Sequence, residues 1–217
     1  MKRILKAWRR GGARLALRVA GDRVSDALAE RSLGIESRGL VPIETLLGQW
    51  RDCHDYFPTT IRDFHRVMES LQVTPDDVFV DYGSGKGRVL TLATRYPFRR
   101  ILGVEISSAL SETARANLAR CVAPHDRDRV EIWTGSAADY ALPADASVLY
   151  FYNPFHGTIL RAVFAEIRRS LLEAPRRMTV VFNNPSHFAR IEGDYPWLRR
   201  VRTLSLEYDC VVYEAAA

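Results

Sequence analysis

The residues best suited to chemistry lie in a glycine-rich loop that runs from Asp81 to Arg88. Glycine recurs at positions 83, 85 and 87, and without side chains there the backbone can approach a ligand closely. Two phosphate-binding motifs fail to match. The dinucleotide motif needs glycine at position 88 or 90, and the P-loop needs serine or threonine at position 87. The pattern that remains is D-x-G-x-G-x-G, with an acid at the start of the loop.

A second acidic residue, Glu105, follows Asp81 by 24 positions, at the end of the next expected strand. This combination resembles the first motifs of class I S-adenosylmethionine-dependent methyltransferases. The ligand fits the charges, because its sulfonium and ammonium groups are cationic and acids at the loop attract them. The resemblance implies cofactor contacts from Asp81, Gly83, Gly85 and Gly87, with Glu105 accepting both ribose hydroxyls.

Three other segments extend the resemblance. Gly135-Ser136-Ala137, after the third expected strand, implies adenine contacts from Ser136 and Ala137. Many relatives have an acid where Ser136 stands, so Asp139 is an alternative adenine contact. The segment 56–60 resembles the part of lysine-type methyltransferases that closes over the methionine end, which implies cofactor contacts from Tyr56, Thr59 and Thr60. Leu33–Gly39 resembles the leader of a family of small bacterial class I enzymes.

The candidate acceptor site is Asn153-Pro154-Phe155, which ends an apolar strand. It is similar to the [DN]-P-P-[YFW] motif of enzymes that methylate nitrogen, with one proline missing. An amine acceptor must be neutral, with its lone pair aimed at the methyl carbon. The Asn153 oxygen and the rigid backbone at Pro154 can accept the amine hydrogens, and Phe155 can stack on the acceptor or make a cation–π contact. We therefore predict methyl transfer to a protein lysine or a small amine, with Asn153 also touching the cofactor.

Other functions stay open at this point. A metabolite oxygen, carbon or ring nitrogen could be the acceptor, and His156 or His187 would then serve as base. A module that binds S-adenosylmethionine without catalysis is a further alternative. A nucleic-acid methyltransferase is disfavoured because the chain beyond residue 18 is nearly neutral, with 24 basic and 26 acidic residues. The failed dinucleotide motif disfavours an oxidoreductase.

These residues must be positioned by alternating strands and helices. Short apolar strands are expected near 78–80, 101–106, 130–133, 147–152 and 178–182, and helices at 59–71, 89–96, 109–121 and 158–172. Segments 201–206 and 209–213 are too close for a crossover helix and must form a hairpin. The fold class is α/β, doubly wound, with a mostly parallel seven-stranded sheet, a C-terminal antiparallel hairpin and an N-terminal helical extension. We expect that extension and its cofactor-capping segment at 1–57, and the Rossmann-like methyltransferase domain at 58–217.

The N-terminal arm, residues 1–18, carries seven basic and no acidic residues. Helices are expected at 2–19 and 22–32, with Gly11-Gly12 interrupting the first. An amphipathic arm of this kind predicts peripheral contact with an anionic membrane as one option. No apolar run approaches the roughly 18 residues that a spanning helix needs. The three separated cysteines indicate a reducing compartment, so we predict a cytoplasmic protein. The histidines show no spacing typical of metal ligands, and we predict no metal site.

Overall fold

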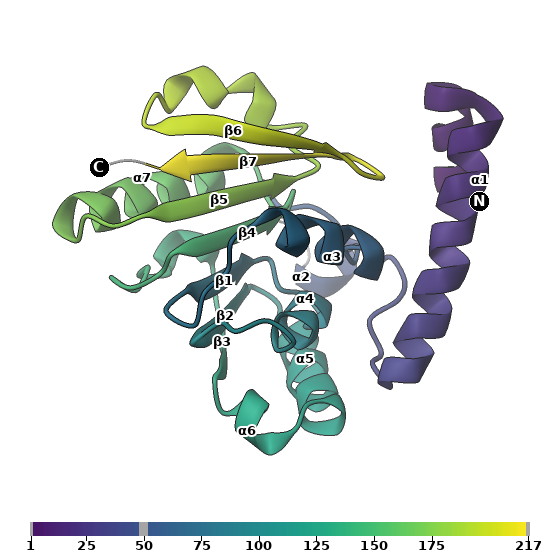
Figure 1. Cartoon of the computed structure of the whole chain (residues 1–217), viewed down its shortest axis with the longest axis horizontal. Helices are drawn as coiled ribbons and strands as arrows, with labels where there is room; N and C mark the ends of the chain where they lie inside the picture. Colours follow the sequence, from purple (N-terminus) through teal and green to yellow (C-terminus); the bar gives the residue numbers. More distant parts are fainter. Residues whose placement is uncertain (1, 48–51, 216–217) are drawn as a thin grey trace.

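The computed structural model describes residues 2–47 and 52–215. Seven strands form one sheet in the order β3-β2-β1-β4-β5-β7-β6 (Figure 1). All neighbours from β3 to β5 pair in parallel, and the last two pairs, β5 with β7 and β7 with β6, are antiparallel. The predicted fold class is confirmed. The strands are β1 Val78–Tyr82, β2 Arg100–Glu105, β3 Val130–Thr134, β4 Val148–Tyr152, β5 Met178–Asn183, β6 Leu198–Ser205 and β7 Asp209–Ala215.

Helices cover both faces of this sheet. Apolar residues of α3, α4 and α5 pack on one face, and those of α7 pack on the other. Parallel strands buried on both faces explain why the sequence shows short continuous apolar runs rather than alternation. The helices are α1 Lys2–Leu33, α2 Ile43–Leu47, α3 Ile61–Ser70, α4 Arg88–Ala93, α5 Ser108–Cys121, α6 Pro124–Arg127 and α7 Gly157–Glu173, with short 3-10 turns η1 Ala137–Asp139, η2 Phe188–Arg190 and η3 Glu192–Asp194.

The sheet brings four loops to one edge. Because β1, β2, β4 and β5 run in parallel, the segments that follow them leave from the same edge of the sheet. The register places Tyr82 opposite Phe151 and Tyr152 opposite Asn183. The glycine loop after β1 is therefore adjacent to the Asn153 segment after β4, as the sequence reading required.

The N-terminal extension differs from the prediction. A single helix, α1, replaces the two that were expected, and it stands beside the sheet (Figure 1). It continues through the Gly11-Gly12 pair, where Gly12 has a φ of 67°. The side chains of the arm's basic residues lie outside the described part of the chain. Among the described residues, no helix has the length and hydropathy that crossing a bilayer requires.

The C-terminal hairpin is confirmed, but its first strand begins three residues before the predicted start. β6 lies at the edge of the sheet and is mostly exposed, including Arg199, Arg200 and Arg202. An exposed edge strand needs no apolar run, so the hydrophobic pattern gave no signal for its beginning. The central strand of the hairpin, β7, is largely buried.

Candidate active site

The glycine loop has the conformation that its sequence requires. Gly83 and Gly85 have φ angles of 80° and 54°, in the region that residues with side chains rarely adopt. Both are also packed tightly. A Cβ atom at position 83 would lie 2.5 Å from the Cβ of Pro154, and one at position 85 would lie 2.2 Å from the Tyr56 ring. The two glycines therefore let the loop touch both the acceptor motif and the capping segment.

Two buried carboxylates face the cavity beside this loop. Asp81 and Glu105 are 3% and 6% exposed, and among the described residues neither forms an ion pair with a basic side chain. Burial, together with the Glu105 charge, raises the pKa of Asp81 well above its usual value. Burial likewise raises the pKa of Glu105. Uncompensated buried acids are costly, and a cationic ligand between them would relieve that cost.

Backbone hydrogen bonds orient the Glu105 carboxylate. Its Oε2 accepts from the Gly85 amide at 2.8 Å, and its Oε1 accepts from the Ser107 amide at 2.9 Å. A carboxylate has about four acceptor positions, so each oxygen retains capacity for a hydroxyl donor. The ribose contact implied by the resemblance is compatible with this geometry, and the residues present fit S-adenosylmethionine.

A cavity of about 270 Å³ lies at this edge of the sheet. It is lined on the cofactor side by Tyr56, Thr59, Asp81, Gly83, Glu105 and Ala137. Four other predicted contacts, Thr60, Gly85, Gly87 and Ser136, are not among its lining residues. Thr60 accepts from the Asp63 amide and begins α3, and Ser136 accepts from the Ala138 amide at the start of η1. In this structure both hydroxyls act as helix caps.

The side of the cavity predicted to hold the acceptor is formed by the ends of β4 and β5. Asn153, Pro154 and Phe155 line the cavity, and so does Asn184. Asn153 and Asn184 have φ angles of 46° and 57°, a left-handed conformation that asparagine tolerates better than most residues. Each follows the last residue of its strand by one position. Two equivalent turns on neighbouring strands thus carry two amides to one cavity.

Phe155 is held in place rather than free to move. Its ring meets those of Tyr82 and Phe151 edge-on, at centroid distances of 6.4 and 6.2 Å. Segment 52–56 runs antiparallel beside it, where the His54 amide donates to the Pro154 carbonyl at 3.0 Å and the His156 amide donates to the Asp52 carbonyl at 2.8 Å. The acceptor wall therefore depends on a segment from the N-terminal extension.

Three histidines gather next to this wall, which the sequence analysis did not foresee. His54, His156 and His187 have ring centroids 4.7–4.9 Å apart. Burial and the other two histidines lower the pKa of His54 to about 4, and burial lowers that of His187. One signal could have found two of them, because the pattern Asn-Pro-x-His occurs twice, at 153–156 and at 184–187.

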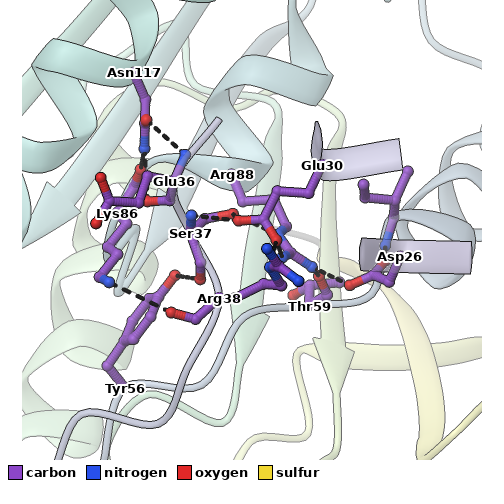
Figure 2. A network of polar contacts seen from close by, with 11 residues as sticks. Asp26, Glu30, Glu36, Ser37, Arg38, Tyr56, Thr59, Lys86, Arg88 and Asn117 are labelled. Carbon is purple, nitrogen blue, oxygen red and sulfur yellow. Dashed lines mark hydrogen bonds and ion pairs between the residues drawn. The ribbon is translucent and has the colours of Figure 1, made fainter. Parts of the chain in front are cut away.

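Arg88 connects the N-terminal extension to the glycine loop. It is 3% exposed and pairs with Asp26 and Glu30 of α1 (Figure 2). Its Nε donates to Ser37 Oγ at 2.8 Å, and its Nη1 donates to the Thr59 carbonyl at 2.9 Å. The local sequence gives no sign that Arg88 is buried, because its partners lie more than 28 residues away. Arg88 positions the loop and the capping segment.

Asn117 of α5 makes a second connection between these parts. Its side chain exchanges two hydrogen bonds with the backbone of Glu36, at 2.9 and 3.1 Å, and donates to the Lys86 carbonyl at 2.9 Å (Figure 2). Tyr56 adds a third, since its hydroxyl donates to the Ser37 carbonyl at 2.7 Å. The segment Leu33–Gly39 is thereby fixed against the glycine loop, the predicted cofactor-binding loop.

Comparison with known sequences agrees with this geometry. Residues 56–140 match the family model described as histone methylation protein DOT1. A protein-lysine N-methyltransferase of Saccharolobus islandicus is 33% identical over 66 residues. That alignment covers 30% of this chain and 41% of the relative, so it spans less than half of that protein.

Solved structures give a broader likeness. An RNA methyltransferase from Salinibacter ruber, in complex with S-adenosyl-L-homocysteine, is 26% identical with a TM-score of 0.51, covering 74% of this chain and 93% of the other. A glycopeptide N-methyltransferase complexed with S-adenosylmethionine has a TM-score of 0.54 at 14% identity, covering 70% and 84%, and shows the shared fold. The sheet order, the glycine loop with its buried acids and these likenesses together show that this chain has the fold of class I S-adenosylmethionine-dependent methyltransferases and a cavity whose residues fit that cofactor.

Proposed function

We propose that this protein transfers a methyl group from S-adenosylmethionine to a nitrogen atom, on a protein lysine or a small amine. The observation that carries the proposal is the pair of amides, Asn153 and Asn184, at the cavity that also contains Asp81 and Glu105. One relative and one family model support the choice of nitrogen, since the relative is a protein-lysine N-methyltransferase and the model describes histone methylation.

The cofactor, when bound, supplies a methyl group on a positively charged sulfur. The residues of the chain then have to position the acceptor. The Asn153 side-chain oxygen can accept a hydrogen from a neutral amine and fix the direction of its lone pair. The buried Phe155 ring excludes water from that side. Orientation and desolvation of this kind can provide most of the acceleration, and no nucleophilic side chain is required.

The test is incubation of the purified protein with labelled S-adenosylmethionine and three acceptor pools: host protein, host RNA and small metabolites. We expect label in protein lysines or in amines, located by mass spectrometry of the digested products. Label found only in RNA, or only on oxygen, would contradict the proposed acceptor. A protein with Asn153→Ala serves as the matched control.

One observation favours a hydroxyl as a second candidate acceptor. His156 Nδ1 lies 3.3 Å from Asp52 Oδ1, and a histidine oriented by a carboxylate is a common arrangement for a general base. A carbon or ring-nitrogen acceptor, and binding without catalysis, have no such support in the structure. Label on oxygen that disappears in Asp52→Asn would favour this candidate over an amine.

We also retain three predictions from the sequence as proposals. The chain divides at residue 57 into an extension and a methyltransferase domain, the protein is cytoplasmic, and the arm 1–18 contacts anionic membranes rather than nucleic acid. Sedimentation with vesicles that contain anionic lipid, compared with neutral vesicles, tests the last of these. The same protein without residues 1–18 is the control.

A further inference from the structure

The three histidines beside the acceptor wall come from separate parts of the chain. His156 follows β4, His187 follows β5, and His54 lies in the segment that pairs with residues 153–156. One candidate ligand atom from each lies within 4.8 Å of those of the other two. All three side chains are half-buried, so the cluster is neither a solvated surface group nor a fully closed core contact.

The repeated Asn-Pro-x-His pattern explains how two of these rings meet. Asn153 and Asn184 both have left-handed backbone conformations one residue beyond neighbouring parallel strands. Each turn then places its histidine three residues later. The His156 and His187 rings stack at 4.7 Å with an interplanar angle of 24°, a distance close to the spacing of adjacent strands. Strand pairing alone therefore accounts for these two.

The third ring has no such explanation. His54 Nε2 is buried and has no hydrogen-bond partner among the described residues, which is unusual for a buried polar atom. Its ring lies 4.9 Å from His156 and 4.7 Å from His187. The unpartnered His54 nitrogen and the two neighbouring imidazoles could together act as ligands of one metal ion.

The surroundings of His156 also fit ligation. Its Nδ1 faces Asp52, which leaves Nε2 available. A carboxylate behind a ligand histidine fixes its tautomer and raises its affinity for metal. Asp52 is itself fixed, because it accepts from the Thr158 amide at 2.8 Å and from the Thr158 hydroxyl at 2.6 Å. Asp52 therefore already lies where a carboxylate would support His156 as a metal ligand.

We propose that His54, His156 and His187 form a binding site for a divalent transition metal ion, with zinc as the best match. Neutral imidazoles suit zinc, copper, nickel and iron, and zinc sites with three histidines leave one coordination position open. Nitrogen ligands around a tetrahedral zinc ion lie about 3.4 Å apart. The three histidine rings, whose candidate ligand atoms lie within 4.8 Å of one another, would therefore have to move only slightly closer together.

The site would lie at the acceptor end of the crevice, because His54 also lines the cavity that contains Asn153 and Asn184. An ion there would present its open position toward the acceptor. This role, which rests on the proposed function, is to bind and orient the acceptor through an atom other than the nitrogen that receives the methyl group. Binding of the ion itself does not depend on that role.

The test uses the full chain, stripped of metal with a chelator and titrated with zinc in a calorimeter. We expect one ion per chain. His156→Ala and His187→Ala should each weaken binding about 100-fold, and Asp52→Asn about tenfold. The control is His125→Ala, whose side chain is 80% exposed and far along the sequence from the cluster, and it should change affinity by less than about twofold. Unchanged S-adenosylmethionine affinity shows that each variant is folded.

Two measurements on the unaltered protein keep the proposal testable if a variant unfolds. Zinc should shift the imidazole nitrogen resonances of three histidines and leave the other two in place. Cobalt should give the visible absorption of a tetrahedral site without a thiolate charge-transfer band. No saturable binding, unshifted histidines, or a thiolate band from nearby Cys53 would each overturn the three-histidine site. A protein that binds zinc here but methylates no amine would contradict the proposed function and leave the metal site intact.

Discussion

The two ends of the crevice are built in different ways. At the cofactor end, the glycine loop, Asp81 and Glu105 come from two neighbouring strands and the turns after them, within 25 residues of sequence. At the end where we propose that the acceptor binds, which we call the acceptor end, the wall combines segments near residues 54, 153 and 184. A short, continuous motif fixes the charge of the cofactor end, whereas the acceptor end depends on long-range packing. Each end can therefore be altered while the other is measured.

The largest effect should come from the support behind the cofactor end. Arg88→Ala removes one partner of a buried network and leaves Asp26 and Glu30 without compensation. Loss of one member of a buried ion pair costs about 3–5 kcal/mol. We expect that decrease in the free energy of unfolding, measured by urea denaturation. The control is Arg99→Ala, whose ion pair with Asp145 is exposed and should matter little. Equal effects of both variants would contradict the structural role of Arg88.

Asn153→Ala should distinguish the two ends of the crevice most clearly, by lowering turnover while leaving cofactor affinity nearly unchanged. If this amide directs the acceptor, turnover should fall about 100-fold, because misplacement of a reacting atom by about 1 Å has that effect. Affinity for S-adenosylmethionine should change by less than about threefold. Steady-state kinetics and calorimetry give the two values. Unchanged turnover would remove Asn153 from the acceptor site.

Glu105→Ala should lower the affinity for S-adenosylmethionine, which Asn153→Ala should leave nearly unchanged. Two hydroxyl hydrogen bonds to a charged group are lost, and even one of them, worth about 1.5–3 kcal/mol, corresponds to a fall of at least about tenfold in cofactor affinity. The Gly85 and Ser107 amides also lose their acceptor, so Glu105→Gln provides the milder comparison. Wild-type affinity in both variants would mean that the ribose binds elsewhere.

Cofactor affinity should also depend on pH. Burial raises the pKa values of Asp81 and Glu105, so in the free protein these groups become neutral at a higher pH than the usual value of about 4. A cationic ligand prefers the ionised carboxylates. Affinity should therefore rise with pH through the raised pKa values and fall on acidification. Calorimetry over this range, with Glu105→Gln giving a flatter curve, tests the direction.

The smallest effect is expected for deletion of residues 1–18. The contacts from α1 to the glycine loop are made by Asp26 and Glu30, which the deletion leaves in place. Cofactor affinity should remain within about twofold of the wild-type value. A large loss would show that the arm belongs to the binding site.

The same contrast explains what the sequence could predict. The seven-stranded sheet could be predicted from apolar runs and from the spacing of the last two strands. The glycine loop could be predicted from a motif in which the absence of side chains lets the backbone approach a ligand closely. Arg88 could not be recognised as buried, because its partners are distant carboxylates on α1. The histidine cluster was missed because no periodicity links His54 to residues 156 and 187. Contacts that join remote segments leave no local pattern.

A crystal structure grown with S-adenosylmethionine tests the cofactor end most directly. We expect the ribose hydroxyls within hydrogen-bond distance of the Glu105 carboxylate and the transferable methyl directed toward Asn153. A ligand bound away from Glu105, or one whose methyl faces away from the ends of β4 and β5, would contradict it.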